Sequence, residues 1–269
     1  MNNAYQIVVC AGIVPDPLQA LEPVNSPQGP ALKNEMMLPA TLDPWASHAL
    51  YEAAHFASKN QGSKVWLVSL APKTKLQQVM MTIAQKAPFE LIAVDCPASG
   101  FADSYEIAKI LAETIKSIPS INFGKLFVFG GWESASRGSG TTLQIVGELL
   151  GITNQFQGVD ELKLNPDGTF DIYERIAEGK HLISRLASPP AVLGWATGNL
   201  PEPRNNPQLG MMNMRNIMPA IQKAKQVKIE NKFIVFENAQ VPKQERQTRI
   251  VKDMPVEEIA KEIVEWIKS

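Results

Sequence analysis

Short apolar runs alternate with segments of helical periodicity through the first 151 residues, and this alternation limits the fold more than any other feature. The runs at 6–10, 64–70, 91–95 and 125–129 are typical of buried strands. Helices are predicted to start at Asp43-Pro44 and after Asp103, and another helix is predicted over residues 75–86. A further helix is predicted to end at Gly151. The order predicts an α/β fold with a doubly wound, mostly parallel sheet. The loops that follow the strands then share one edge, where ligands bind in such sheets.

The pattern changes after Gly151. Segments 155–164 and 169–173 flank Asn165-Pro166-Asp167-Gly168 and predict a hairpin. Two more strands are expected at 181–186 and 191–196, and the second should return to the main sheet. Segments 15–40 and 198–222 show no clear hydrophobic period. Residues 226–250 are predicted to form a charged, extended arm, and residues 255–268 an amphipathic helix. We therefore expect an α/β domain over 1–225 and a separate arm with its helix over 226–269.

A loop of small residues, GGWESASRGSGTT (residues 130–142), joins the fourth predicted strand to a helix. Backbone N–H groups and the positive end of a helix favour a phosphate at such a place, and small side chains allow its approach. A flexible connection is the structural alternative. This stretch alone leaves both interpretations open.

Charge and cysteine content exclude some classes of function. The chain has 26 basic and 27 acidic residues, which argues against general nucleic-acid binding. Cys10 and Cys96 form no CxxC spacing or disulfide framework, so we expect the protein to work in the reducing interior of a cell. The N-terminus enters a strand without a basic leader, and no apolar stretch approaches the roughly 20 residues that cross a bilayer. These features predict a soluble, cytoplasmic protein.

No catalytic or metal-ligating set is evident in the sequence. His48, His55 and His181 have no ligand spacing. Ser136 and Ser139 lie outside any GxSxG elbow, and the loop lacks the Lys-Ser/Thr ending of a P-loop. The GxGxxG motif of a standard dinucleotide-binding fold does not follow the first predicted strand. What remains is a loop that would hold a phosphate without phosphate chemistry, and we expect a protein without catalytic side chains.

Four methionines lie in segment 198–222, namely Met211, Met212, Met214 and Met218. Methionine commonly fills gaps in a core, but flexible thioethers also suit adaptable partner surfaces. Because the run lacks periodicity and is flanked by Pro207 and Pro219, we expect a partner-binding loop.

Several stretches, in this order, resemble the electron transfer flavoprotein beta subunit. They are IVVCAGIVPDP (7–17), LDPWASHALYEAA (42–54), VWLVSLAP (65–72), YERIAEGKHLISRLASPPAVLGW (173–195), and LPEPRN (200–205) followed by NIMPAIQKAKQ (216–226). The resemblance runs over most of the chain. It implies an adenine nucleotide alpha-hydrolase-like, or Rossmann-like, nucleotide-binding domain.

The resemblance also implies cofactors and partners. Family members form a heterodimer with an alpha subunit, which holds most contacts to a redox-active FAD, and the beta subunit holds a structural AMP. The pair carries electrons from flavin dehydrogenases of the acyl-CoA dehydrogenase type to a quinone oxidoreductase or a similar acceptor. The arm and helix of 226–269 would pack on the alpha subunit.

Carried over by motif, the resemblance assigns two sets of residues. The nucleotide-binding set is Cys10, Asp43, Pro44, Trp45, Ala46, Leu70, Glu133, Ser134, Ser136, Arg137, Gly138, Ser139, Gly140, Thr141, Thr142 and Gln144. Segment 198–222 would be the recognition loop for the dehydrogenase, with Arg204 and an apolar anchor at Leu209, Met212 or Met214.

Some residues depart from the family pattern. Asp43 stands where Asn is usual, Leu70 replaces a small residue, and Leu143 replaces a glycine of close approach. The acidic run of electron-bifurcating members, which hold a second FAD in this pocket, is absent. The segments 18–40 and 205–215 are also longer than usual. The pocket would therefore hold AMP, FAD or nothing, and we expect AMP.

Two other classes of protein share the strand–helix alternation. A stand-alone nucleotide-binding regulator of the universal-stress type would form a homodimer that binds ATP, but it has no role for the hairpin or the arm. An adenylating enzyme of the PP-loop type requires Ser-Gly-Gly-x-Asp-Ser after the first strand, where this chain has AGIVPDP. The first remains an alternative, and the second is discounted.

Overall fold

The computed structural model describes residues 4–27, 29–97, 100–243 and 248–268. The chain divides into two compact units, Met1–Ala239 and Gln240–Ser269. The division falls later than the boundary expected at residue 225, because segment 226–239 belongs to the first unit.

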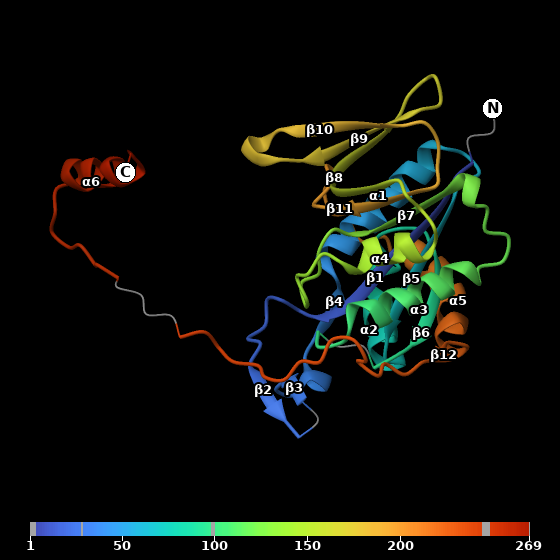
Figure 1. The fold of residues 1–269 in the computed structure, drawn as a ribbon, viewed down its shortest axis with the longest axis horizontal. Coiled ribbons are helices and arrows are strands. Elements are labelled where there is room, and N and C mark those ends of the chain that lie inside the picture. Colours follow the sequence, from blue (N-terminus) through green and yellow to red (C-terminus); the bar gives the residue numbers. More distant parts are fainter. Residues whose placement is uncertain (1–3, 28, 98–99, 244–247, 269) are drawn as a thin grey trace. The chain divides into compact units, whose positions relative to one another are not determined.

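The first unit is built on a sheet that has ten strands within the described part of the chain (Figure 1). Its order is β10-β9-β8-β11-β7-β1-β5-β6-β12, and β4 pairs with the end of β1. Neighbouring strands pair in parallel along the part of the sheet that runs from β8 to β12 in this order. At the other end, β9 pairs antiparallel with both β8 and β10. The parallel core consists of β1 (Gln6–Pro15), β5 (Lys64–Ala71), β6 (Glu90–Asp95), β7 (Leu126–Gly131) and β11 (Ala191–Trp195). The predicted α/β class and mostly parallel sheet are confirmed.

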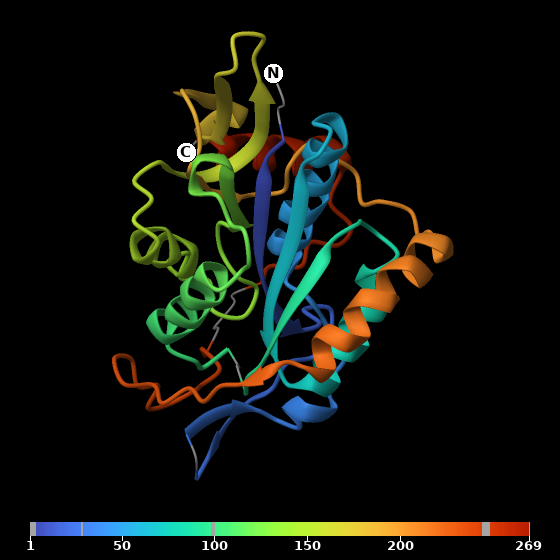
Figure 2. The ribbon, with the colours of Figure 1, turned by 90° about the vertical axis from the view of Figure 1, so that its right-hand side faces the viewer.

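The parallel strands are nearly continuous apolar sequences because both faces of the sheet are covered. In β1, Ile7 and Val9 face one hydrophobic cluster, and Val8 faces the other. Figure 2 shows the helices on the two sides of the sheet. One side carries α1 (Pro44–Lys59), α2 (Lys73–Ile83) and α5 (Pro207–Gln222), and the other carries α3 (Ser104–Lys116) and α4 (Thr142–Leu149).

The helix starts predicted at two aspartates are confirmed. Asp43 caps α1 by accepting a hydrogen bond from the Trp45 N–H at 3.2 Å, and proline occupies the first turn. Asp103 caps α3 in the same way, through the Tyr105 N–H at 2.8 Å. Both aspartates follow the pattern in which a side-chain oxygen satisfies one free amide of the first turn.

The predicted hairpin is also confirmed. It joins β8 (Gln155–Leu164) to β9 (Phe170–Arg175), and β10 (His181–Leu186) continues the antiparallel layer. Phe170 of β9 is buried, and its ring lies 5.1 Å from the ring of Phe127 in the central sheet. This contact ties the antiparallel layer to the core. Short 3₁₀ turns occur at Phe123–Lys125 and Ala177–Gly179.

Two segments without sequence period have regular structure. Within 15–40 lie a small antiparallel pair, β2 (Pro23–Ser26) and β3 (Gly29–Leu32), a 3₁₀ turn at Glu35–Met37, and the start of β4 (Ala40–Leu42). Segment 198–222 was expected to be a loop, and this was wrong for its second half, which forms α5. Asn206 caps this helix, and Asn213, Ile217 and Ile221 are buried on its inner side. The buried asparagine interrupts the apolar pattern that would have revealed the helix.

The rest of the first unit after α5 is mainly extended. Strand β12 (Lys225–Gln226) pairs with β6, and the Val227 N–H donates to the Asp95 carbonyl at 2.9 Å. In the second unit, α6 (Val256–Lys268) is an amphipathic helix with no buried residue, and Arg249 forms an ion pair with Glu262. Among the described residues, none of the helices has the length and apolar character that a membrane crossing requires.

Candidate functional site

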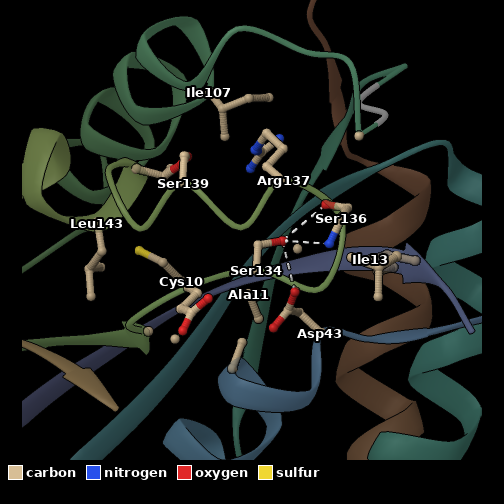
Figure 3. A pocket seen from close by; sticks show the side chains of 18 of the residues that line it. Cys10, Ala11, Ile13, Asp43, Ile107, Ser134, Ser136, Arg137, Ser139 and Leu143 are labelled. Atoms are coloured by element: carbon tan, nitrogen blue, oxygen red, sulfur yellow. Dashed lines mark hydrogen bonds between the residues drawn. The ribbon is translucent and has the colours of Figure 1, made fainter. Parts of the chain in front are cut away.

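A pocket opens at the carboxyl edge of the central strands (Figure 3). It contains about 940 Å³ of space that no protein atom fills, part of which is open to solvent. Its walls come from the end of β1, the first turn of α1, the middle of α3, the small-residue loop (residues 130–142) and the start of α4. This is the position at which open α/β sheets bind ligands.

Most residues of the predicted nucleotide-binding set line this pocket. Those that do are Cys10, Asp43, Ala46, Leu70, Glu133, Ser134, Ser136, Arg137, Ser139, Gly140, Thr141 and Thr142. Four others lie outside its lining. Pro44 and Trp45 form the first turn of α1, where Trp45 packs against Gly131, while Gly138 and Gln144 are exposed.

Asp43 connects α1 to the small-residue loop. Its carboxylate is buried and accepts hydrogen bonds from the Ser134 hydroxyl and the Ala135 N–H, both at 2.9 Å, in addition to the cap bond from Trp45. Burial raises the pKa of Asp43, and these hydrogen bonds oppose the rise. Because every one of these bonds needs an oxygen acceptor, a carboxylate suits the position better than the asparagine expected there.

Arg137 is the only arginine among the lining residues. Its Nε atom is buried without a hydrogen-bond partner among the described residues. Burial lowers the pKa of the guanidinium, and the negative charge of Asp43 raises it. A guanidinium remains protonated despite such burial, so the pocket contains a cation whose Nε donor is not used.

The first turn of α4 adds backbone donors to the same pocket. Thr141 stands at the cap position but its side chain makes no capping hydrogen bond, and its hydroxyl lies 3.2 Å from that of Ser139. Gly138 and Gly140 have φ of 64° and 63°, a region that glycine adopts without strain. The glycines therefore permit the turn that leads into α4 with its first amides uncapped.

Leu70 and Leu143, the two leucines that depart from the family pattern, lie along the walls of the pocket. A Cβ at Gly130 would be 3.0 Å from a methyl group of Leu143, so Gly130 provides the space in which this side chain packs. Leu70 is buried in the same face of the core. Burial also raises the pKa of the Cys10 thiol to about 12, which makes this sulfur a poor nucleophile.

Sequence reasoning missed several lining residues and a neighbouring hollow. The missed residues include Ile13, Val14, Glu35, Ile107 and Leu111. A signal was available for Ile13 and Val14, because they continue the apolar run of β1 toward the carboxyl edge. The hollow contains about 660 Å³ of space, some of it open to solvent. It shares Ile13, Val14, Pro15 and Glu35 with the pocket and adds Met36, Leu38, Ala40, Ala71, Pro72, Lys75 and Pro97.

The predicted docking residues are divided between surface and core. Arg204 and Met212 are exposed, while Leu209 and Met214 are half-buried and Met214 packs on the core. A shallow groove between α2 and α5 is lined by Met81, Gln85, Pro207, Gly210, Met211, Met214 and Arg215. Met81 and Met211 are exposed; Met211 belongs to the methionine cluster expected to bind a partner, whereas Met81 was not predicted. Helix α5, rather than a loop, presents this methionine-rich surface.

The histidines have separate environments. His48 and His55 are half-buried on α1, and burial lowers the pKa of both. The His181 Nε2 atom lies 3.0 Å from the Asp160 carboxylate, which also pairs with Arg175. In the described ranges, no three His, Cys, Asp or Glu residues form a group suited to a metal ion.

Comparison with known proteins identifies the family. The sequence matches the model of the electron transfer flavoprotein domain over residues 34–232. No curated protein matches the chain at a significant level. The matched region includes α1 through α5, the small-residue loop and nearly all of the sheet. The chain therefore belongs to the electron transfer flavoprotein domain family.

Proposed function

We propose that this protein is the beta-type subunit of a heterodimeric electron transfer flavoprotein and that its pocket holds a structural AMP. The observation that carries the proposal is Arg137, a half-buried cation whose buried Nε donor is unused and which lies beside an uncapped helix start. A phosphate would satisfy both, since guanidinium groups and helix N-termini each favour anions. The hydroxyls of Ser136, Ser139, Thr141 and Thr142 supply further donors around it.

The remaining lining fits the rest of a nucleotide. Ile13, Val14, Ile107 and Leu111 form apolar walls on either side of the polar loop. Ligand sites commonly combine such walls with a few polar groups that fix orientation. The residues in the pocket therefore fit AMP, with Arg137 and the small-residue loop at its phosphate.

The pocket is suited to holding a nucleotide and not to transforming it. Ser134 bonds to Asp43 and lies 3.0 Å from Ser136, so its hydroxyl is engaged in the loop structure. The high pKa of Cys10 removes the thiol as a nucleophile. We therefore propose an electron carrier subunit without catalytic side chains, whose FAD is held mainly by the alpha subunit.

Exposed apolar side chains on α5 and α6 are the proposed contact surfaces for the partner proteins. On α6, Val256, Ile263, Val264 and Ile267 are exposed within the second unit and would pack on the alpha subunit. Met211 and Met212 on α5 would contact a flavin dehydrogenase. Thioether side chains adapt to different partner shapes, as a carrier between a donor and an acceptor such as a quinone oxidoreductase requires.

The hollow beside the pocket favours one alternative. Because it continues the pocket past Ile13 and Val14, a ligand longer than AMP would find space there. A second FAD, as in electron-bifurcating members, is therefore the second candidate for this site.

The test is co-expression with an alpha-type subunit from the same source. We expect a yellow 1:1 heterodimer, and acid extraction should release one FAD and one AMP per complex. Two FAD and no AMP would support the bifurcating alternative. A chain that stays apart from the alpha subunit and purifies as an ATP-binding homodimer would refute the proposal.

A further inference from the structure

The segment 230–239, here called the tether, is fixed to the first unit at two places just before the second unit begins. The tether contains four successive exposed apolar side chains, those of Phe233, Ile234, Val235 and Phe236. An extended segment whose apolar side chains are exposed makes few buried contacts that would stabilise its position. The anchors therefore determine where this segment lies.

The first anchor is a pair of carboxylates at the start of α3. Glu106 accepts hydrogen bonds from the backbone N–H groups of Glu230 at 2.6 Å and Lys232 at 2.8 Å. Asp103, which already caps α3, accepts from Phe233 at 3.1 Å and Ile234 at 3.3 Å.

Side chains complete the first anchor. The Asn231 side chain accepts from the Asp103 N–H at 2.9 Å. The ring of Phe233 lies 4.9 Å from that of Tyr105, and the ring of Phe236 lies 5.7 Å from that of Phe101. Five successive tether residues, 230–234, thus depend on the first turn of α3 and the residues just before it.

The second anchor is Asn25 on the β2–β3 pair. Its side-chain oxygen accepts from the Ala239 N–H at 2.9 Å, and its Nδ2 donates to the Ala239 carbonyl at 3.1 Å. The same Nδ2 lies 2.7 Å from the Asn238 side-chain oxygen. Asn25 therefore satisfies both backbone groups of the last residue of the first unit.

The first anchor belongs to a helix that also lines the pocket, and the second belongs to a strand pair that precedes a lining residue in the sequence. Helix α3 contributes Ile107 and Leu111 to the pocket wall, and Figure 3 shows Ile107 above Arg137. Ile107 is the residue after Glu106, so the wall and the first anchor share one helical turn. The β2–β3 pair leads to the turn at Glu35, which also lines the pocket.

We propose that the tether couples occupancy of the nucleotide pocket to the point at which the C-terminal unit leaves the domain. This inference rests on AMP as the ligand of the proposed function. AMP orders the α3 wall and the Glu35 turn, which steadies both anchors, and an anchored tether in turn favours AMP binding. Such coupling is reciprocal because each site changes the free energy of the other.

Hydrogen exchange on the full chain tests the coupling. With saturating AMP, the amides of residues 230, 232, 233, 234 and 239 should exchange at least about fivefold more slowly than without it, which is the lower end of typical couplings. Amides of the turn at 165–168, which contacts neither anchor, should exchange equally fast in both samples. Calorimetry on the same preparation reports AMP binding independently. Binding with unchanged exchange in the tether overturns the coupling alone, while absence of binding overturns the proposed site as well.

A variant pair tests the reverse direction. Glu106→Gln removes one acceptor oxygen from the first anchor and should raise the Kd for AMP by about the same fivefold factor. Glu113→Gln makes the same change at an exposed position of α3 and should leave the Kd unchanged. Asn25→Ala weakens the second anchor without touching α3 and should act in the same direction as Glu106→Gln. Equal AMP affinity in all variants would overturn the proposal.

Discussion

At the scale of single residues, the pocket depends on one cation and one carboxylate that influence each other. Asp43 has no donor of its own and is surrounded by donors from α1 and the small-residue loop. Arg137 is the reverse case, because its Nε–H donor is buried and has no acceptor among the described residues. The negative charge of Asp43 favours the protonated guanidinium, so the carboxylate both shapes the loop and supports the charge that an anion requires.

Arg137→Ala should weaken AMP binding without destabilising the fold. Loss of a charge-assisted contact of about 1.5–3 kcal/mol corresponds to a roughly 10- to 100-fold rise in Kd. Thermal unfolding should stay unchanged, because the side chain's Nε has no protein acceptor to lose. In the heterodimer, the flavin absorbance should remain. Arg215→Ala, on the exposed side of α5, is the control, and loss of flavin with AMP retained would contradict the assignment.

Asp43→Ala should lower the free energy of unfolding by about 2–3 kcal/mol, because it removes the cap of α1 and the acceptor for Ser134 and Ala135. Asp43→Asn retains one oxygen and should cost about half as much, since Asn caps helices as well as Asp. Urea titration of both variants measures the difference. Equal stability of Asp43→Ala and the unchanged protein would mean that the loop is held by other contacts.

At the scale of elements, α5 shows why a helix was missed. Its buried face contains Asn213, whose Nδ2 donates to the carbonyls of Ala84 and Ala87, both at 2.8 Å. These carbonyls lie at the end of α2, so the asparagine joins two helices. A polar residue in this role breaks the hydrophobic period that identifies a helix in sequence.

Asn213→Ala should destabilise the protein by about 1–3 kcal/mol, because two buried carbonyls lose their donor. Asn216→Ala lies on the exposed side of the same helix and should change stability by no more than about 0.5 kcal/mol. Chemical denaturation of the two variants provides the comparison. Similar effects at both positions would show that helix propensity, rather than the buried hydrogen bonds, determines the loss.

The attachment of the tether to α3 should depend on pH. Hydrogen bonds from the backbone of Lys232 and Glu230 hold the pKa of Glu106 below its usual value. A carboxyl group with a lowered folded pKa stabilises the attachment above its unfolded pKa and loses this effect as the pH falls through the folded value. Protection of the tether amides, corrected for intrinsic exchange, should therefore be higher at about pH 6 than at about pH 3.5. In Glu106→Gln this difference should shrink, and an unchanged difference would exclude Glu106 as its source.

At the scale of the whole molecule, the first unit contains the entire buried core of the described chain. Every member of the two hydrophobic clusters precedes residue 230, and α6 buries none of its residues. The aromatic contacts of Phe170 join the antiparallel layer to the same core. Stability of the first unit therefore arises within residues 1–239.

Removal of residues 240–269 should leave the first unit folded. We expect the Tm to change by less than about 4 °C, because no core contact is lost. Binding of AMP should persist, while association with an alpha subunit should be lost. Differential scanning calorimetry and co-purification measure these two outcomes. A truncated chain that fails to fold would show that the second unit contributes to the core.

The order of residues was enough to predict the strands, most of the helices and the edge at which the pocket opens. Apolar runs such as VWLVSL predicted the strands because a sheet covered on both faces requires continuous burial, and Asp43 and Asp103 marked helix starts through local capping. Features that depend on contacts between distant segments could be found only in the folded chain. These include helix α5, whose inner face contains a polar residue, and the unpartnered guanidinium of Arg137. They also include the tether, which is held by backbone hydrogen bonds to Asp103, Glu106 and Asn25 and therefore leaves no pattern in its own side chains.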